Sequence, residues 1–351
     1  MIDIISILLE KGHAYKGEDG SVYFKLNSFP EYGRLAKIDK ENLRPGVRIE
    51  VDEYTKDNVH DFALWKAYQE ADGEIVFDSP FGRGRPGWHI ECSAMAMKYL
   101  GNHFDMHTGG VDNIFPHHEN EIAQSECSTG ETYVNYWLHS EHLIVENKKM
   151  SKSLGNFFTL RDLIEKGYSP ASIRYLLISN HYRQQLNFTF DGLDAAATCV
   201  DRLNSFKIRL KEIEYDSTLN NGEVSAEVKL LIEKSLEKFD ASLCDDLNVS
   251  PALAAIFDLM NDVNSRIAEE NLNSKEAIAV MEFLDKTNEI LGIFRDEEDS
   301  IPEEVTKMLE ERIQAKQDKN WALADELRDS IKNLGYVIED TKKGSRVKKI
   351  Q

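Results

Sequence analysis

The feature that most constrains the fold is a lysine-rich stretch between a short apolar strand and the start of a helix. The stretch is Asn147-Lys-Lys-Met-Ser-Lys-Ser-Leu-Gly-Asn156, which follows Leu143-Ile-Val145 and precedes Thr159-Leu-Arg-Asp162. This order of an apolar run, a polar loop, a glycine and a helix cap is typical of a strand–loop–helix unit. We therefore expect a loop that follows a sheet strand.

The polar groups of this loop suit an anionic ligand with several oxygens. Lys149 and Lys152 bring two point charges, and Ser151 and Ser153 bring hydroxyls. A phosphate chain is the obvious ligand for such a set. A solvated charged turn is the simpler interpretation of two lysines taken alone, so the choice depends on the rest of the chain.

Residues 81–157 alternate between helix and strand patterns. We expect a helix from Trp88 to Gly101, a strand over 104–108 that ends at Gly109-Gly110, a helix opened by Phe115-Pro116, and a strand over 142–145. This alternation predicts half of a parallel, doubly wound sheet. Ligands of such sheets bind beyond the carboxyl ends of the strands, where Gly109-Gly110 and the lysine loop are expected.

The flanking regions have different characters, and they predict four segments. Residues 1–12 read as a helix that stops at Gly12, and the rest of 1–80 as a small antiparallel insertion. The α/β segment that contains the lysine loop would cover 81–190. Helical spacing from Ser169-Pro170 onward predicts an antiparallel bundle over 191–300. Residues 301–351 would form a small, mainly helical domain with a short strand at 336–340.

Composition restricts the class of protein. The 351 residues include 42 basic and 62 acidic ones, so a net charge of −20 disfavours indiscriminate nucleic-acid binding. The stretch 341–350 has five basic residues and no acid, which suits either a local nucleic-acid footprint or a solubilising tail. Four scattered cysteines and the lack of a long apolar run predict a reducing cytoplasm and no membrane span.

A second group of residues has the chemistry of a metal site. His117 and Glu121 are four residues apart on a predicted helix, so their side chains share a face, and Cys92 lies on another helix that could meet them. Thiolate, imidazole and carboxylate form a zinc donor set with one position open. His118 is an alternative to His117, and a surface ion pair with an unrelated buried thiol is the simpler interpretation.

Several motifs resemble one family. Lys149-Met-Ser-Lys-Ser153 is similar to the second signature of class I aminoacyl-tRNA synthetases. Three longer motifs resemble the cysteinyl-tRNA synthetases in particular. They are Gly87-Trp-His-Ile-Glu-Cys-Ser-Ala-Met95, Gly109-Gly-Val-Asp112 and Phe115-Pro-His-His-Glu-Asn-Glu-Ile-Ala-Gln124. The similarity extends from Gly12-His-Ala-Tyr15 to Asn320-Trp-Ala-Leu-Ala-Asp325.

The resemblance implies a fold and a reaction. It implies the second half of a Rossmann-type class I synthetase catalytic domain with an inserted antiparallel element, a helical bundle and a small C-terminal helical domain. It also implies ATP-dependent activation of cysteine to cysteinyl-adenylate and transfer to tRNA(Cys), with magnesium on the ATP. The bundle and the basic C-terminal end would hold the anticodon limb of the tRNA.

The same resemblance implies roles for single residues. Zinc would be held by Cys92, His117 and Glu121 and would bind the thiolate of the substrate, which excludes serine without an editing step. Trp88 would line the pocket and Asp112 would bind the amino group. Lys152 would be the main ATP contact, assisted by Lys149, Ser151 and Ser153. A core aromatic and a turn former are the simpler interpretations of Trp88 and Asp112.

The chain departs from the family pattern in one respect. Family members also have a His-Ile-Gly-His signature and a first zinc-ligating cysteine, and neither is found in this sequence; Gly12-His13 is no match. We therefore expect the chain alone to form cysteinyl-adenylate poorly, or to pair with a chain that supplies the first half, although the full-length family is expected to be monomeric. A non-catalytic tRNA-binding paralogue and a cysteine–amino-sugar ligase are the alternative functions.

Overall fold

A computed structural model describes residues 1–351 except 39–42, 50–58, 215–221, 295–302, 342–343 and 350–351. The chain divides into two compact units. Unit 1 contains residues 1–142 and 182–185, and unit 2 contains 143–181 and 186–351. None of the described helices is both long and apolar enough to cross a membrane.

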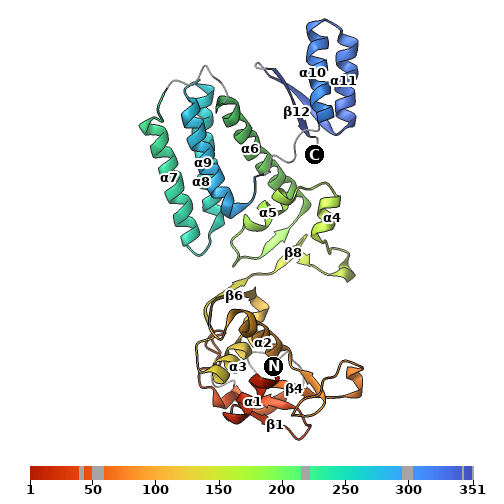
Figure 1. Ribbon diagram of the computed structural model, residues 1–351, viewed down its shortest axis with the longest axis vertical. Coiled ribbons are helices and arrows are strands. Elements are labelled where there is room, and N and C mark those ends of the chain that lie inside the picture. Colours follow the sequence, from red (N-terminus) through yellow and green to blue (C-terminus); the bar gives the residue numbers. More distant parts are fainter. Residues whose placement is uncertain (39–42, 50–58, 215–221, 295–302, 342–343, 350–351) are drawn as a thin grey trace. The chain divides into compact units, whose positions relative to one another are not determined.

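Unit 1 begins with a helix and a five-stranded sheet (Figure 1). The elements are α1 (Ile2–Glu10), β1 (Ala14–Lys16), β2 (Val22–Phe24), β3 (Leu43–Ile49), β4 (Val59–Ala67) and β5 (Gly84–Pro86). The order is β1-β2-β4-β3, with β5 also paired to β4. The expected insertion is confirmed as a small sheet, but its purely antiparallel character is wrong, because β3 and β4 pair in parallel. Residues 50–51 of the expected strand lie outside the described residues.

Helices α1, α2 (Trp88–Leu100) and α3 (Glu119–Thr129) cover this sheet. Ile5 and Leu8 of α1 are fully buried, and Ile90 of α2 joins them against the sheet residues Phe24 and Phe62. The Phe24 and Phe62 rings stack at 5.0 Å. Apolar burial of this kind contributes about 25 cal/mol per Å². It fixes α2, which carries Cys92, and α3, which carries Glu121; His117 lies in the π-helical turn Ile114–His118 that leads into α3.

A separate parallel pair, β6 (Phe104–Gly110) and β7 (Val134–Ser140), completes unit 1. The prediction that residues 142–145 continue the sheet of β6 is therefore wrong. The partner of β6 is β7, while the strand at 143–145 is β8 in unit 2. The strand β7 was missed because its sequence, Val134-Asn-Tyr-Trp-Leu-His-Ser140, mixes apolar and polar residues without a clean alternation.

Unit 2 begins with a three-stranded sheet around the lysine loop. It contains β8 (Leu143–Val145), β9 (Lys148–Lys149) and β10 (Leu186–Phe188), with α4 (Leu160–Glu165) and α5 (Pro170–Ile178). β10 runs parallel to β8, and β9 runs antiparallel to it. The helix starts agree with the sequence, because Thr159 and Asp162 form a capping box and Ser169 caps α5.

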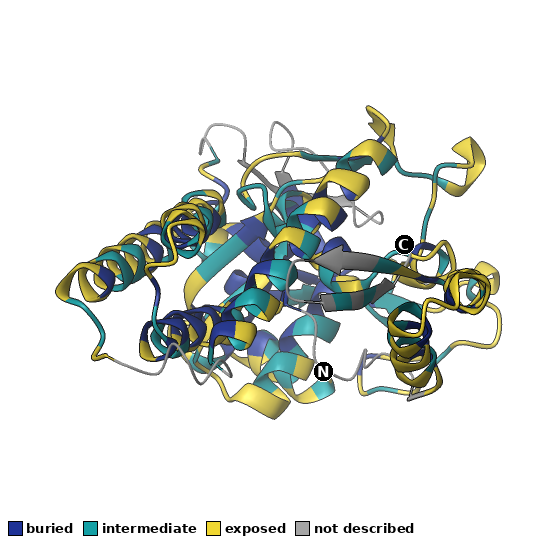
Figure 2. Cartoon of the chain, turned by 90° about the horizontal axis from the view of Figure 1, so that it is seen from above, coloured by how far each residue is buried: buried dark blue, intermediate teal, exposed yellow. Residues whose placement is uncertain are grey.

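The expected bundle consists of α6 (Phe190–Glu214), α7 (Ala226–Cys244), α8 (Val249–Ala268) and α9 (Ser274–Leu291). The four helices lie side by side in Figure 1. Figure 2 shows that helices of the chain are exposed along one face and buried along another. Phe206, Phe239, Ile256 and Leu284 are central to a continuous core. Within one helix the buried side chains recur at three and four positions, as Leu253, Ile256, Met260 and Val263 do in α8, which explains why the sequence predicts the helices well.

The C-terminal part contains α10 (Glu303–Gln317) and α11 (Trp321–Asn333), followed by the hairpin β11 (Tyr336–Thr341) and β12 (Gly344–Lys349). Val305, Ile331 and Tyr336 form its small core. Residues 344–349 of the basic stretch form the strand β12, so the frayed-tail alternative is wrong for them.

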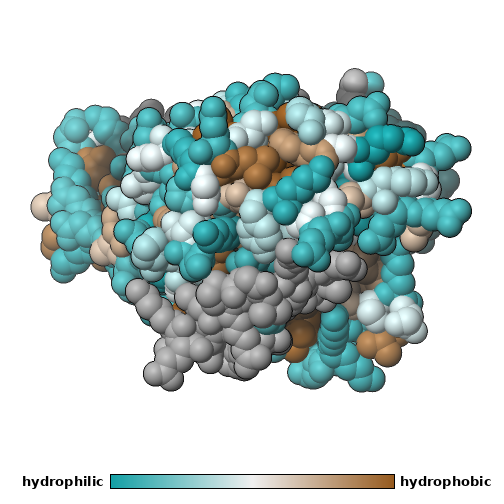
Figure 3. Space-filling view, turned by 90° about the horizontal axis from the view of Figure 1, so that it is seen from below, coloured by the Kyte–Doolittle hydropathy of each residue, from teal (hydrophilic) through white to brown (hydrophobic). Residues whose placement is uncertain are grey.

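The face of the molecule in Figure 3 is mainly hydrophilic with scattered apolar side chains, as the high charge content leads one to expect.

Candidate metal centre and lysine loop

Tight backbone packing places the start of α2 against β4. A Cβ atom at Gly87, the residue before α2, would lie 2.1 Å from the carbonyl oxygen of Ala63 on β4. Only glycine fits such an approach. This contact fixes the first turns of α2, and with them Trp88 and Cys92.

The structure brings Cys92, His117 and Glu121 together. One donor atom from each of the three lies within 4.8 Å of the others, and Nε2 of His117 is 3.0 Å from Oε1 of Glu121. The two helical residues meet because they are four positions apart, whereas Cys92 reaches them because α2 packs on α3. The Glu121 side chain is fully buried, and its Oε1 faces the His117 imidazole in place of water. A buried acceptor of this kind is costly unless a cation meets it.

The electrostatics of His117 also indicate a place for a cation. Burial would lower the pKa of His117, but hydrogen bonds with the Cys92 thiol and the Glu121 carboxylate outweigh it and raise the pKa to about 9. A positive charge is thus favoured between a thiol and a carboxylate. Because this donor set is the one that zinc prefers, the residues fit a zinc ion with at least one position left open.

Two residues from elsewhere in unit 1 support these ligands. Nδ1 of His89 is 2.8 Å from Nδ1 of His117, and the Tyr133 hydroxyl donates to Oε2 of Glu121 at 3.2 Å. Burial and the nearby His117 lower the pKa of His89 to about 3, so His89 is neutral and can accept the Nδ1 proton of His117. Nε2 of His117 and Oε1 of Glu121 then remain for a metal, which is the usual role of outer partners.

The alternative ligand His118 is also near Glu121. His107, His118 and Glu121 form a second trio with donor atoms within 4.8 Å, but Nδ1 of His118 is paired at 2.8 Å with Nε2 of His139. Burial, together with the neighbouring histidines, lowers the pKa of His118 to about 3. This trio lacks a thiol, so it suits zinc less well than the trio with Cys92.

Sequence reasoning missed His89, His107, Tyr133 and His139 around this cluster. His89 could have been found, because it lies inside the quoted Trp88–Cys92 motif. The others lie on β6, on β7 and just before β7, and their positions depend on the parallel pairing of the two strands. No local sequence signal specifies that pairing.

The two expected substrate residues, Trp88 and Asp112, come from different elements of unit 1. The Trp88 ring is 44% exposed and 4.2 Å from the His117 ring, so it borders the metal cluster with one face open. Asp112 is exposed in a short turn, Val111–Asn113, between β6 and the segment that carries His117. A Cβ atom at Gly110 would lie 2.3 Å from Oδ1 of Asp112, so a larger residue there would displace this carboxylate.

The lysine loop lies in unit 2 and is exposed. Lys149 ends β9, and Lys152 starts a short 3-10 turn, Lys152–Leu154, that Ser151 caps through the Leu154 amide. The hydroxyls of Ser151 and Ser153 are 3.2 Å apart. The Lys152 ammonium lies 5.6 Å from the centre of the Phe157 ring. The loop therefore presents its two lysines and two hydroxyls to solvent.

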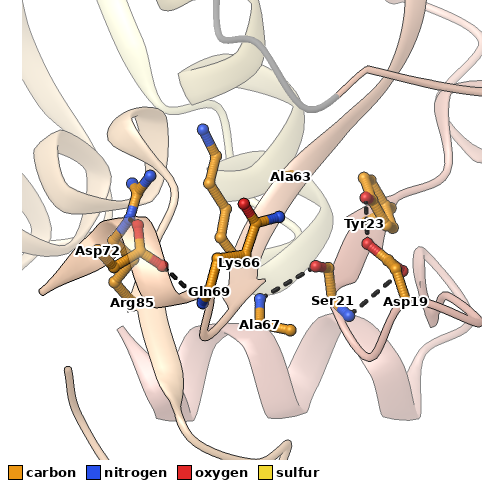
Figure 4. A pocket seen from close by; sticks show the side chains of 9 residues that line it. All are labelled: Asp19, Ser21, Tyr23, Ala63, Lys66, Ala67, Gln69, Asp72 and Arg85. Carbon is orange, nitrogen blue, oxygen red and sulfur yellow. Dashed lines mark hydrogen bonds and ion pairs between the residues drawn. The ribbon is translucent and has the colours of Figure 1, made fainter.

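A hollow of about 80 Å³ lies on the sheet of unit 1, apart from the metal cluster (Figure 4). Its charged groups largely satisfy one another. Asp72 pairs with Arg85 at 2.8 Å, and Asp19 accepts from the Tyr23 hydroxyl at 2.7 Å. These internal pairs explain the polarity of the hollow without a ligand.

Comparison with known proteins covers almost the entire chain. Residues 1–198 match the family described as tRNA synthetases class I (C) catalytic domain, 238–295 match the DALR domain, and 298–347 match the cysteinyl-tRNA ligase anticodon binding domain. A cysteine–tRNA ligase of Protochlamydia amoebophila is 51% identical over 354 residues, which are 99% of this chain and 73% of the relative.

Two further matches agree with this assignment. A cysteine–tRNA ligase of Brachyspira hyodysenteriae is 50% identical, over 99% of this chain and 74% of the relative. A solved structure of a putative arginyl-tRNA synthetase from Campylobacter jejuni has a TM-score of 0.51 at 14% identity, and it covers 84% of this chain and 60% of its own. The second likeness supports the class I synthetase fold alone.

Proposed function

The chain belongs to the cysteine–tRNA ligase family, and we propose that its two clusters divide the reaction of that family between them. Cys92, His117 and Glu121 would hold a zinc ion that selects cysteine, and the lysine loop would act on the phosphates of ATP. The observation that carries the first assignment is the convergence of a thiol, an imidazole and a fully buried carboxylate, with one donor atom from each within 4.8 Å of the others.

The zinc site would provide selection by ligand chemistry. When bound, zinc supplies an acceptor that prefers a thiolate to a hydroxyl, so it can separate cysteine from serine where a pocket of the same shape cannot. His89 and Tyr133 hold His117 and Glu121 in place for it. Trp88 would cover one side of the substrate, and the Asp112 carboxylate would bind its ammonium group.

The lysine loop would act on the developing charge. As the cysteine carboxylate attacks the α-phosphorus of ATP and pyrophosphate leaves, negative charge grows on the phosphate oxygens. The ammonium groups of Lys152 and Lys149 and the hydroxyls of Ser151 and Ser153 are suited to meet that charge, with magnesium bound to the phosphates as part of the substrate. Because the lysines are exposed before the ligand arrives, they can contribute more to the transition state than to the ground state.

The acceptor would be tRNA(Cys). The match of residues 298–347 to an anticodon binding domain supports tRNA over an amino-sugar acceptor. The ordered basic strand β12 would contribute phosphate contacts, which makes tRNA binding salt-dependent. We place the reaction in the cytoplasm, where four unpaired cysteines remain reduced.

A metal-substitution experiment tests the zinc assignment without requiring turnover. The chain is loaded with cobalt in place of zinc and titrated with cysteine or serine while the thiolate-to-cobalt charge-transfer band is recorded. We expect cysteine, but not serine, to strengthen this band, and we expect Cys92→Ala to abolish stoichiometric metal binding. Cys127→Ala is the matched control, because that buried thiol lies outside the cluster. Equal responses to cysteine and serine would refute the selection role.

A further inference from the structure

We propose that Asn156 is a positioning residue, whose side-chain amide holds the backbone of the lysine loop so that Lys149 and Lys152 point into one binding region. The inference rests on the proposed role of these lysines at the ATP phosphates. Asn156 lies outside the Lys149–Ser153 stretch, and its proposed role is to fix the loop backbone, which the lysine side chains do not do.

The contacts of Asn156 join the two sides of the loop. Its Oδ1 accepts a hydrogen bond from the backbone amide of Ser151 at 2.9 Å, and its Nδ2 donates to the carbonyl oxygen of Lys149 at 3.1 Å. The same Nδ2 lies 3.5 Å from the carbonyl oxygen of Val145 in β8. One planar amide thus fixes the peptide groups on both sides of Met150, next to each of the two lysines.

The rest of the loop depends on this amide for its shape. Before it, Asn147 and Asn187 exchange two hydrogen bonds at 2.8 and 3.0 Å, which anchor the turn between β8 and β9 to β10. Met150 packs on the core around Val145. Beyond Met150 the contacts are local: the Ser151 cap on Leu154, the Ser151–Ser153 pair, the Gly155 amide donating to the Lys152 carbonyl at 3.1 Å, and the Lys152 ammonium over the Phe157 ring.

The chemistry requires an amide at this position. One side chain must accept from the backbone N–H of Ser151 and also donate to the backbone carbonyl of Lys149. Aspartate keeps the acceptor but has no donor for the Lys149 carbonyl, and alanine has neither. Asn156 is half-buried, so water replaces its hydrogen bonds only in part.

Trypsin provides a direct test, because its targets Lys149 and Lys152 are exposed in the loop. Cleavage of a loop that opens and closes rapidly follows the population of the open form. We expect Asn156→Ala to speed cleavage after Lys149 and Lys152 by about tenfold, the size expected for two lost hydrogen bonds, and Asn156→Asp to have a smaller effect. Asn204→Ala is the matched control, since that amide bonds within α6, at the carbonyl of Val200.

Binding of MgATP then separates a positioning role from a merely structural one. We expect Asn156→Ala to weaken MgATP binding by about tenfold in the normal chain and by less than twofold in a Lys152→Ala background, since the two residues act as a unit. Unchanged cleavage in Asn156→Ala, or an equal loss of MgATP affinity in both backgrounds, would overturn the inference. If Lys152→Ala leaves the MgATP affinity of the chain unchanged, the proposed function of the loop is refuted. The cleavage rates would still show whether Asn156 holds the loop backbone.

Discussion

The candidate zinc cluster and the lysine loop differ in how the fold holds their side chains. In the cluster, the ligand side chains of His117 and Glu121 are buried and supported by His89 and Tyr133, so the geometry exists before any ligand binds. In the loop, Lys149 and Lys152 are exposed, and the backbone is held by the Asn156 amide and by the Asn147–Asn187 pair at its start. A site that must discriminate between similar substrates benefits from rigidity, whereas groups that meet a developing charge can be mobile.

The largest effect should come from removing a ligand of the rigid site. We expect Cys92→Ala to weaken zinc binding on the order of a thousandfold, which exceeds the 10- to 100-fold loss usual for an outer partner. Competition with a chromophoric chelator measures the change. Circular dichroism must show a folded chain, and the control Cys127→Ala should bind zinc normally. Unaltered zinc affinity in Cys92→Ala would remove the thiol from the site.

The next effect is a pH dependence that only the rigid site should show. The folded-state pKa of His117 is raised from 6.5 to about 9, so in the zinc-free chain its protonation stabilises the fold fully below about pH 6.5. That contribution is lost as the pH rises through about 9. Zinc must displace the same proton, so zinc affinity should rise by about tenfold per pH unit over this window for each proton released.

Two measurements test these directions. Thermal unfolding of the zinc-free chain from pH 6 to 10 should show stability falling as the pH rises. Calorimetry of zinc addition in two buffers should show the release of a proton. A variant without the titrating imidazole, His117→Gln, should lose the proton release assigned to that group. Zinc affinity that is flat between pH 6.5 and 9 would contradict the assignment of His117 as a ligand.

A smaller effect is expected in the loop, and it should leave stability alone. We expect Lys152→Ala to weaken MgATP binding by about 10- to 100-fold, because a hydrogen bond to a charged group contributes about 1.5–3 kcal/mol. Lys149→Ala should have a smaller effect. Both lysines are exposed, so the melting temperature should stay within about 1 °C of the parent value. A large loss of stability would mean that the loop is more integrated than its contacts indicate.

The smallest effect tests the support of the rigid site. We expect Tyr133→Phe to weaken zinc binding by about tenfold, because it removes the hydroxyl that orients Glu121 and keeps the ring that packs in the core. Tyr168→Phe is the matched control, since the hydroxyl of Tyr168 donates to Asp194 in unit 2. Equal zinc affinities for both variants would show that Glu121 binds zinc equally well without the hydrogen bond from Tyr133.

Local sequence signals predicted the helices more accurately than the sheets. The capping pair of Thr159 and Asp162 and the Ser169-Pro170 start are confirmed, and so is the apolar spacing of the bundle. Such signals act over a few residues, so a short window contains them. The pairing of β6 with β7 and of β8 with β10 was missed, because strand pairing depends on residues far apart in the chain.

For the candidate metal site, the sequence by itself placed His117 and Glu121 on one helical face, because helical periodicity alone brings residues four apart together. Only the tertiary structure decided that Cys92 meets them, since that contact requires α2 to pack on α3. The same holds for His89 and Tyr133, whose hydrogen bonds to the cluster span 28 and 12 residues. Periodicity is a property of one helix, whereas convergence of donors is a property of packing between elements.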